Sequence, residues 1–316
     1  MAIPISLIVD DGAPVNLAYW LRPRQKYVHL IPNAVARDFA GICERHGAAG
    51  KFSVLPMPSQ LGRLDEGLNY VPDRHLQGFL KVARERIAPL FDITVELLTH
   101  QAAYDLARRR YLHVYEDAWV SRASVSEMAD YIALAMRILK NVGIPPNGVT
   151  SPWAAGIDNE KRYAEAIARA TRRVTGRKFA WYFLHCLGSG KGRWPWIAWQ
   201  DKKAGLVTVT VPANTHDRLW ASQDAGSARA ARAAVESGID QWLTADGRRG
   251  KIRDLFDAGL PIVILTHWQS LFSNGRCAGL AGLEKLFGRV EKAFGAGVRW
   301  MRCSELARTA LKRKAE

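Results

Sequence analysis

Short apolar runs rich in β-branched residues alternate along the whole chain with longer stretches in which apolar residues recur at helical spacing. Eight of these runs have the length and composition of strands, and several are apolar on both faces, which is typical of strands covered by helices. In chain order they are ISLIVDD (5–11), KFSVLPM (51–57), ITVELLTH (93–100), NGVTSPW (147–153), KFAWYFLHC (178–186), LVTVTVPANTH (206–216), PIVILTHW (261–268) and VRWMRCSEL (298–306). This alternation predicts a parallel sheet joined by crossover helices.

The stretches between these runs predict the helices. Ser124 and Glu127 form a capping-box pattern at the start of one of them, and glycine or proline closes most of the others. The expected helices cover 34–46, 73–89, 125–140, 159–174, 228–257 in two pieces, and 279–294. No stretch has the composition of a linker, so we expect a single α/β domain over residues 1–316. The fold class that fits is a (β/α)7–8 barrel, a distorted TIM barrel.

Two segments are longer than strand-to-helix connections require. Residues 101–124 follow the third expected strand, and residues 188–203 follow the fifth. Both leave from the carboxyl ends of strands, the face of a barrel that carries active sites. We therefore expect these segments to form walls of a substrate site.

Composition and charge argue against nucleic acid and membranes as binding partners. Hydrophobic residues make up 48% of the 316 residues, which is ordinary for a globular protein, and the net charge is +15. The basic residues fall mainly in helical stretches without a nucleic-acid-binding motif, so we expect no nucleic-acid partner. The sequence has neither an apolar run long enough to cross a membrane nor a signal-peptide pattern, which predicts a cytoplasmic protein without a membrane partner. The oligomeric state is left open.

Polar residues stand at the carboxyl ends of the expected strands. They are Asp10 and Asp11 on the first, His100 on the third, Ser151 to Trp153 on the fourth, His185 on the fifth, Asn214 to Asp217 on the sixth and His267 on the seventh. Each alone has an ordinary structural explanation, and an Asp-Asp-Gly sequence also suits a solvated turn. Because parallel strands of a barrel end on one rim, the residues together indicate a common site.

Carboxylate and imidazole side chains together suit a divalent metal ion, most readily Zn²⁺. Such an ion makes a water more acidic, and a carboxylate beside a metal-binding carboxylate can take the proton of that water. The neighbouring residues Asp10 and Asp11 would then divide these two tasks. This pattern predicts a metal-dependent hydrolase.

The stretches LIVDDG, LLTH, TSPW and VILTHWQSL occur in the order of the sequence motifs of polysaccharide deacetylases of the NodB type (carbohydrate esterase family 4-like), which this chain resembles. The resemblance implies a distorted barrel and removal of an acyl group from a carbohydrate. It also implies that Asp10 is the catalytic base, that Asp11 and His100 bind the metal, and that His267 is the general acid.

The chain departs from that family at two motifs. The family has a second histidine four residues after the first, and here that position is Tyr104, followed by Asp105. We therefore hypothesise that Asp105 is the third metal ligand. The motif that normally supplies an arginine to orient the base reads TSPW and contains none, which would leave Asp10 less well held.

The aromatic residues favour a carbohydrate as the substrate. The chain has eleven tryptophans, several of them near the expected rim, and tryptophan faces stack on the apolar faces of sugar rings. The expected substrate-binding residues are Trp153, His185, Asn214, Asp217 and Trp268.

Two alternatives to a deacetylase remain open at this point. A barrel with an altered ligand set can be a glycan-binding protein without catalytic activity. A glycoside hydrolase would place Asp10 and a second carboxylate, Asp217 or Asp105, on either side of a glycosidic bond and would need no metal.

Overall fold

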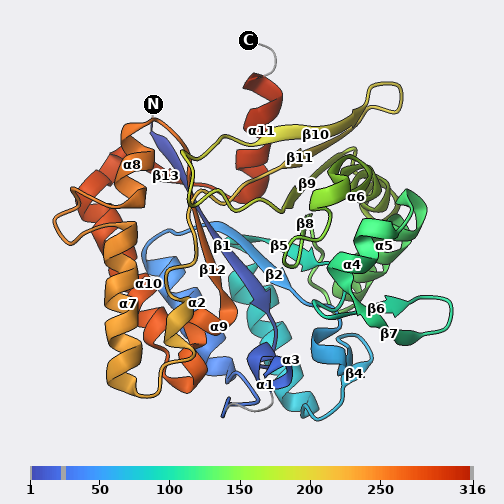
Figure 1. Ribbon diagram of the computed structural model, residues 1–316, viewed down its shortest axis with the longest axis horizontal. Coiled ribbons are helices and arrows are strands. Elements are labelled where there is room, and N and C mark those ends of the chain that lie inside the picture. The colour runs from blue at the N-terminus through green and yellow to red at the C-terminus, as the bar shows by residue number, and fades with distance from the viewer. Residues whose placement is uncertain (1, 23–25, 314–316) are drawn as a thin grey trace.

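The computed structural model describes residues 2–22 and 26–313, and its centre is a nine-stranded, mainly parallel sheet (Figure 1). A strand is found in each of the eight predicted runs, although the run 298–306 is strand only over Val298–Trp300 and helical from Cys303. Only the pairing of β10 with β11 is antiparallel within this sheet. In spatial order the strands are β10 (Trp196–Asp201), β11 (Leu206–Thr210), β9 (Phe179–Phe183), β8 (Gly148–Thr150), β5 (Phe91–Glu96), β2 (Gly50–Val54), β1 (Ile3–Gly12) and β12 (Ile262–His267), while β13 (Val298–Trp300) also pairs with β1.

Helices connect and cover these strands. The six predicted helical regions are confirmed, including the capping box of Ser124 and Glu127, and α3 continues into a π-helical turn at Ala83–Ile87. The helices are α1 (Leu17–Leu21), α2 (Asn33–Arg45), α3 (Asp73–Val82), α4 (Glu116–Arg122), α5 (Val125–Asn141), α6 (Glu160–Thr175), α7 (Ala228–Trp242), α8 (Lys251–Asp257), α9 (Trp268–Phe272), α10 (Ala278–Phe294) and α11 (Cys303–Arg313). Within 2–22 and 26–313, none is long and apolar enough to cross a membrane.

The helices form separate groups around the sheet (Figure 1). Helices α7 and α10 pack together on one side, and α5 and α6 pack together on the other. Helix α11 lies against β10 and β11, and its Leu306 joins an apolar cluster with Ile8, Trp181 and Val263 from three strands. This cluster is separate from the larger one that the other helices form with the sheet, so the described residues form two hydrophobic clusters.

The predicted barrel is found only in part, because the sheet is not closed by a strand ladder between β11 and β12. The hairpin strand β10 pairs along the whole of β11 and occupies the edge that would meet β12. Pro212 follows and has no N–H to donate. Beyond it, the amide of Asn214 donates to the carbonyl of Val263 at 2.9 Å, so the chain reaches β12 only after β11 has ended.

The two long segments contain more structure than we expected. Residues 101–124 form the hairpin β6 (Ala102–Asp105) and β7 (Arg110–Tyr115) followed by α4, and residues 188–203 contain β10. Short strands β3 (Gly62–Arg63) and β4 (Gly67–Leu68) form a further hairpin. None of these hairpins covers the carboxyl ends of β1, β5 and β12, where Asp10 and Asp11, His100 and His267 meet.

The close approach of β1 and β2 gives a test of the packing. A Cβ atom added at Gly50 would lie 1.8 Å from the carbonyl oxygen of Leu7, so Gly50→Ala should destabilise the fold by about 1–3 kcal/mol or more. Gly288 in α10 has no neighbour within 4 Å of an added Cβ, and Gly288→Ala should stabilise it by about 0.5–1 kcal/mol. Urea unfolding of both variants measures the difference, and effects of the same sign would contradict this packing.

Candidate active site

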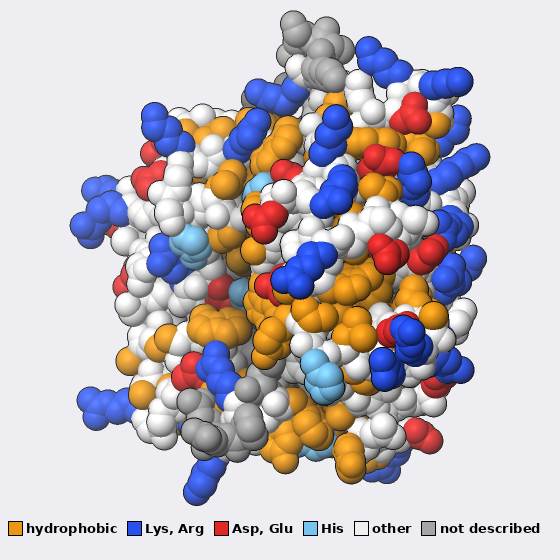
Figure 2. All heavy atoms as spheres, turned by 45° about the vertical axis from the view of Figure 1, so that its right-hand side comes forward, with side chains coloured by type: hydrophobic (Ala, Val, Ile, Leu, Met, Phe, Trp, Pro, Cys, Tyr) orange, Lys and Arg blue, Asp and Glu red, His pale blue; other side chains and the backbone are white. Residues whose placement is uncertain are grey.

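The carboxyl ends of the strands open onto a cavity of about 300 Å³. In Figure 2, acidic and histidine side chains lie in a hollow bordered by apolar side chains, while lysines and arginines are spread over the surrounding face. The residues that line the cavity include Asp10, Asp11, Arg22, Glu96, His100, Trp153, Cys186, Trp220, Gln223, His267 and Gln269. Besides the strand ends, α1 and the short 3₁₀ helix Trp220–Ser222 contribute to its wall, whereas no residue of the segments 101–124 and 188–203, which we expected there, lines it.

A bulge at the end of β1 brings two consecutive carboxylates to this cavity. Asp10 pairs in register with His267 of β12, and the register with β2 then shifts between Val9 and Gly12. Successive side chains of a regular strand point to opposite faces. Because Asp11 has a positive φ of 65°, the alternation is broken and both aspartates line the cavity.

Left-handed backbone is repeated at two other residues of the cavity wall. His100 has a φ of 59° and Trp153 a φ of 48°, in addition to Asp11. Residues other than glycine rarely take this conformation, and each instance costs free energy that the surrounding structure must supply. Such residues are concentrated at functional sites in proteins.

Asp11, Glu96 and His100 form a compact buried group that could hold a metal ion. One ligand atom from each lies within 4.8 Å of the others. The Nε2 atom of His100 is 2.9 Å from Asp11 Oδ1 and 3.3 Å from Glu96 Oε1. Glu96 Oε2 also accepts hydrogen bonds from the Asp11 amide at 2.7 Å and from Ser53 Oγ at 2.6 Å, which fix its position.

The electrostatics of this group suit a cation. Burial and the negative charges of Asp11 and Asp10 raise the pKa of Glu96 to about 8. Burial opposes protonation of His100, but the charge and hydrogen bond of Asp11, with the charge of Glu96, prevail and raise its pKa to about 10. Two carboxylates and one imidazole are donors that Zn²⁺ and similar divalent ions accept, so the residues present fit such an ion.

Asp10 is held by a buried lysine. Lys51 of β2 is fully buried, and its Nζ donates to Asp10 Oδ1 and, at 2.6 Å, to Thr150 Oγ1. Our expectation that Asp10 would be less well held without an arginine is therefore wrong, because Lys51 supplies the positive charge from another strand.

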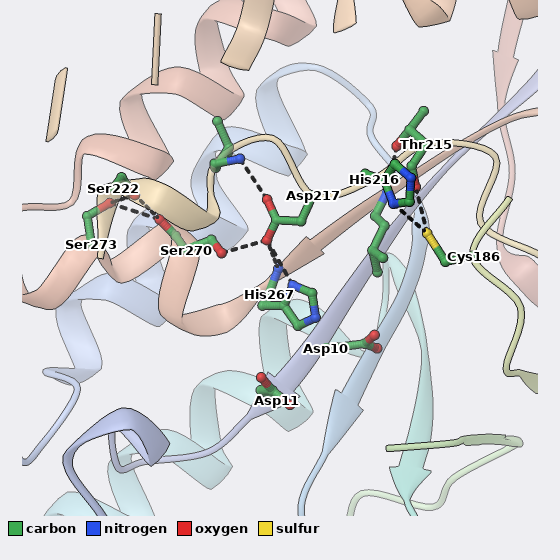
Figure 3. Close-up of polar contacts among 12 residues, drawn as sticks. Asp10, Asp11, Cys186, Thr215, His216, Asp217, Ser222, His267, Ser270 and Ser273 are labelled. Carbon is green, nitrogen blue, oxygen red and sulfur yellow. Dashed lines mark hydrogen bonds and ion pairs between the residues drawn. The ribbon is translucent and has the colours of Figure 1, made fainter. Parts of the chain in front are cut away.

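His267 is oriented by Asp217 (Figure 3). Asp217 Oδ2 is 2.8 Å from His267 Nδ1 and also accepts from the His267 amide at 3.1 Å and from Ser270 Oγ at 2.6 Å. Burial lowers the pKa of His267, but the hydrogen bond and charge of Asp217, with the charges of Asp11 and Asp10, raise it to about 9. The imidazole is thus protonated at neutral pH and can donate a proton.

The structure brings together most of the residues predicted to carry chemistry. Asp10, Asp11, His100 and His267 line one cavity, as does Trp153, whose ring lies edge-on to His100 with centroids 5.0 Å apart. Asp217 lies behind His267 and contacts it directly, so it positions the imidazole and is not itself part of the cavity lining.

Asp105, the hypothesised third metal ligand, lies elsewhere. It ends β6, where its side chain accepts hydrogen bonds from the amides of Ala107 and Arg108 at 3.0 Å and pairs with the Arg108 guanidinium at 3.0 Å. These contacts stabilise the turn between β6 and β7. Glu96, four residues before His100, is the carboxylate that completes the group.

Besides Asp217, three further predicted substrate-binding residues do not line the cavity. His185 pairs with Glu160 at 2.7 Å. Asn214 is fully buried, and its amide bonds backbone atoms of Arg193 and Pro261. Trp268 is also fully buried, and its Nε1 donates to the carbonyl of Ala13 at 3.1 Å. All three are therefore structural residues at or behind the rim.

The sequence carried a signal for the residues that we missed. Glu96 stands inside the apolar run ITVELLTH, and Lys51 begins the run KFSVLPM. Acidic and basic residues are rarely fully buried unless they are paired, so a charge inside an expected buried strand indicates a partner within the fold.

The sequence matches no family model and no curated protein. Among solved structures it is similar to 4-alpha-glucanotransferase from Thermococcus litoralis, with a TM-score of 0.47 and 12% identity over 97% of this chain and 40% of that one. It is also similar to a "putative cellobiose-phosphate cleavage protein" from Enterococcus faecalis V583, with a TM-score of 0.46 and 11% identity over 97% of this chain and 100% of that one. This chain thus spans less than half the length of the glucanotransferase. At these values the likeness assigns neither an activity nor a substrate to this chain.

The contact between Asp217 and His267 predicts a change in titration. Asp217→Asn removes the charge that stabilises the imidazolium, so the pKa of His267 in the metal-free protein should fall from about 9 toward its ordinary 6.5. NMR titration of the histidine ring signals measures this. Asp224→Asn, a carboxylate that pairs with Arg22 at the rim, is the control and should leave that pKa near 9.

The same shift predicts the pH dependence of stability. Because the folded-state pKa of His267 is raised, its contribution is complete below about pH 6.5 and is lost as the pH rises through 9. The difference in free energy of unfolding between the wild type and Asp217→Asn should therefore shrink over that interval. A difference that grows with pH would contradict the assigned interaction.

Proposed function

We propose that this protein is a metal-dependent hydrolase that removes an acyl group, most simply acetyl, from a carbohydrate, on a distorted barrel of the polysaccharide deacetylase type. The observation that carries the proposal is the buried group of Asp11, Glu96 and His100, which shares one cavity with Asp10 and His267. A metal-ligand set, a carboxylate base and a protonated imidazole together are sufficient for metal-dependent hydrolysis of an acyl bond.

The residues that would hold the metal are Asp11, Glu96 and His100. Zn²⁺ is the preferred ion because it accepts carboxylate oxygen and imidazole nitrogen at low coordination number and leaves a position open in catalytic sites. When bound, a divalent cation supplies Lewis acidity, which makes an acyl carbonyl more electrophilic and a water more acidic.

Asp10 would act as the general base. Its carboxylate lines the cavity next to the ligand Asp11 and is held by Lys51 and through it by Thr150. Held in this way at the cavity, the carboxylate of Asp10 is placed to take a proton from the attacking water.

His267 would act as the general acid toward the leaving group. It faces the same cavity, and Asp217 keeps the imidazole in one orientation with Nδ1 engaged. The other ring nitrogen is then free to donate its proton to the departing nitrogen or oxygen of the carbohydrate.

Aromatic residues at the rim support a carbohydrate as the substrate. Trp153 lines the cavity and is 47% exposed, and its ring centroid lies 5.3 Å from that of the exposed Tyr115. A glycoside hydrolase that pairs Asp10 with Asp217 or Asp105 is less favoured, because Asp217 is engaged by His267 and Ser270 and Asp105 lies in a hairpin turn.

Metal content tests the ligand set. Glu96→Gln removes a charged ligand and should weaken Zn²⁺ binding by more than about tenfold, since even indirect partners of a metal ligand contribute that much. Asp105→Asn is the matched control and should bind like the wild type. Elemental analysis after desalting measures the zinc that each variant retains. If Asp105 were the third ligand in place of Glu96, Asp105→Asn would lose zinc and Glu96→Gln would retain it.

Acetate release tests the chemistry. Asp10→Asn should lower kcat on acetylated oligosaccharides by about 10²- to 10⁴-fold while metal is retained, because it removes only the base. Asp11→Asn should lose the metal and the activity together.

Asp10→Asn also leaves Lys51 buried without a counter-charge, which costs about 3–5 kcal/mol in comparable cases. The double variant Asp10→Asn with Lys51→Met removes both charges and separates loss of the base from loss of the fold. If the folded, metal-loaded wild type releases no acetate from any acetylated oligosaccharide, the glycan-binding alternative takes the place of the deacetylase.

A further inference from the structure

Two glutamines in the cavity wall have no hydrogen-bond partners. Gln223 is 2% exposed and Gln269 is 3% exposed, and both line the cavity. The amide nitrogen and the amide oxygen of each have no partner among the described residues. Nearly all buried polar side-chain atoms in proteins are paired, so four unpaired amide atoms in one cavity wall need an explanation.

A serine network fixes the backbone beside both glutamines (Figure 3). Ser222 Oγ lies 3.1 Å from the Ser270 carbonyl oxygen and 2.8 Å from Ser273 Oγ, which in turn donates to the same carbonyl at 2.8 Å. Ser222 precedes Gln223 and Ser270 follows Gln269, so the network joins the two segments that carry the glutamines. The hydrogen bonds therefore fix the distance between the backbone positions of Gln223 and Gln269.

The surroundings indicate the chemistry of the missing partner. An amide both donates and accepts, which matches a hydroxyl group. The four amide atoms are covered in the free protein, so the side chains must turn to meet a ligand, and the terminal torsion of glutamine is broad. Trp220 lines the same wall, with its ring centroid 4.8 Å from that of His267. The nearby guanidinium of Arg22 is paired with Asp224 at 3.0 Å, so the wall does not offer a free cation to an anionic ligand. These features suit a neutral, hydroxylated ring.

We infer that Gln223, Gln269 and Trp220 form a binding subsite for the hydroxyl groups of the sugar ring whose nitrogen or oxygen receives the proton of His267. This inference rests on the proposed function and adds the location and polarity of the sugar. The two glutamines set specificity for hydroxylated substrates over other acyl compounds, and the tryptophan covers an apolar face of the ring.

Gln223→Met and Gln269→Met test the inference, since methionine nearly preserves length and removes both polar atoms. The probes are N-acetylchitopentaose and acetylated xylo-oligosaccharides, with 4-methylumbelliferyl acetate as an acyl compound whose leaving group is not a sugar. Each variant should lower the ratio of kcat/KM for a hydrolysed oligosaccharide to that for the aryl acetate by about tenfold, mainly through KM. Gln77→Met, on the exposed face of α3, is the control and should leave the ratio unchanged.

Thermal unfolding supplies a second readout. Removing a buried amide that has no partner in the free protein should raise Tm by roughly 2 °C. A rise in Tm together with a loss of oligosaccharide discrimination supports a subsite. A rise in Tm with an unchanged ratio of kcat/KM values overturns the subsite, because the amides would then have no part in substrate recognition. An equal loss of kcat/KM on the oligosaccharide and on the aryl acetate also overturns it.

Failure of the proposed function is distinguishable from failure of this inference. If the wild type hydrolyses neither kind of substrate, calorimetric titration with N-acetylchitopentaose replaces the kinetics. If binding is weakened about tenfold in both glutamine variants, but not in Gln77→Met, the subsite is supported even though the protein is not an enzyme of the proposed kind. Absent binding, or binding that is equal in all variants, overturns the subsite.

Discussion

The cavity at the carboxyl ends of the strands depends on the buried ion pair of Lys51 and Asp10. An ammonium group in the protein interior is tolerated only with a counter-charge and further hydrogen bonds, and Lys51 finds them on β1 and on β8. Strands β1, β2 and β8 must therefore keep the register that brings these side chains together. That register also places Asp11, one residue farther along β1, against His100 and Glu96 of the β5 segment. The remaining groups of the cavity follow from the parallel arrangement, which puts His267 beside Asp10.

Much of this arrangement could be predicted from the sequence, because apolar runs report buried strands and parallel strands end at a common edge. Asp10, Asp11, His100 and His267 each stand at the carboxyl end of an expected strand, so their meeting in one cavity needs no knowledge of side-chain contacts. The same reasoning placed Asn214 and Trp268 at the rim. Position at a strand end does not fix the direction of a side chain, and both of these turn into the protein, where backbone carbonyls accept their N–H groups.

The parts that could not be predicted depend on contacts between residues far apart in sequence. Glu96 and Lys51 stand within expected strands, and periodicity reports that such positions are buried without naming the partner. The open seam between β11 and β12 arises from the pairing of β10, in a segment that has the composition of a loop. Asp105 was chosen by its distance from His100 along the chain, whereas the carboxylate that meets His100 lies four residues on the other side.

The left-handed backbone at Asp11, His100 and Trp153 has a consequence for glycine substitutions at the cavity. Glycine would adopt this conformation without steric cost at all three positions, yet the chain keeps an aspartate, a histidine and a tryptophan there. Each choice sacrifices about 1–3 kcal/mol of folding free energy. Eight other described residues that are not glycine also have left-handed backbone, and none of them lines the cavity, so this conformation alone does not mark a functional residue. At the cavity it fixes the directions of three lining side chains, so a glycine at any of these positions would relieve the backbone and at the same time remove a group from the cavity wall.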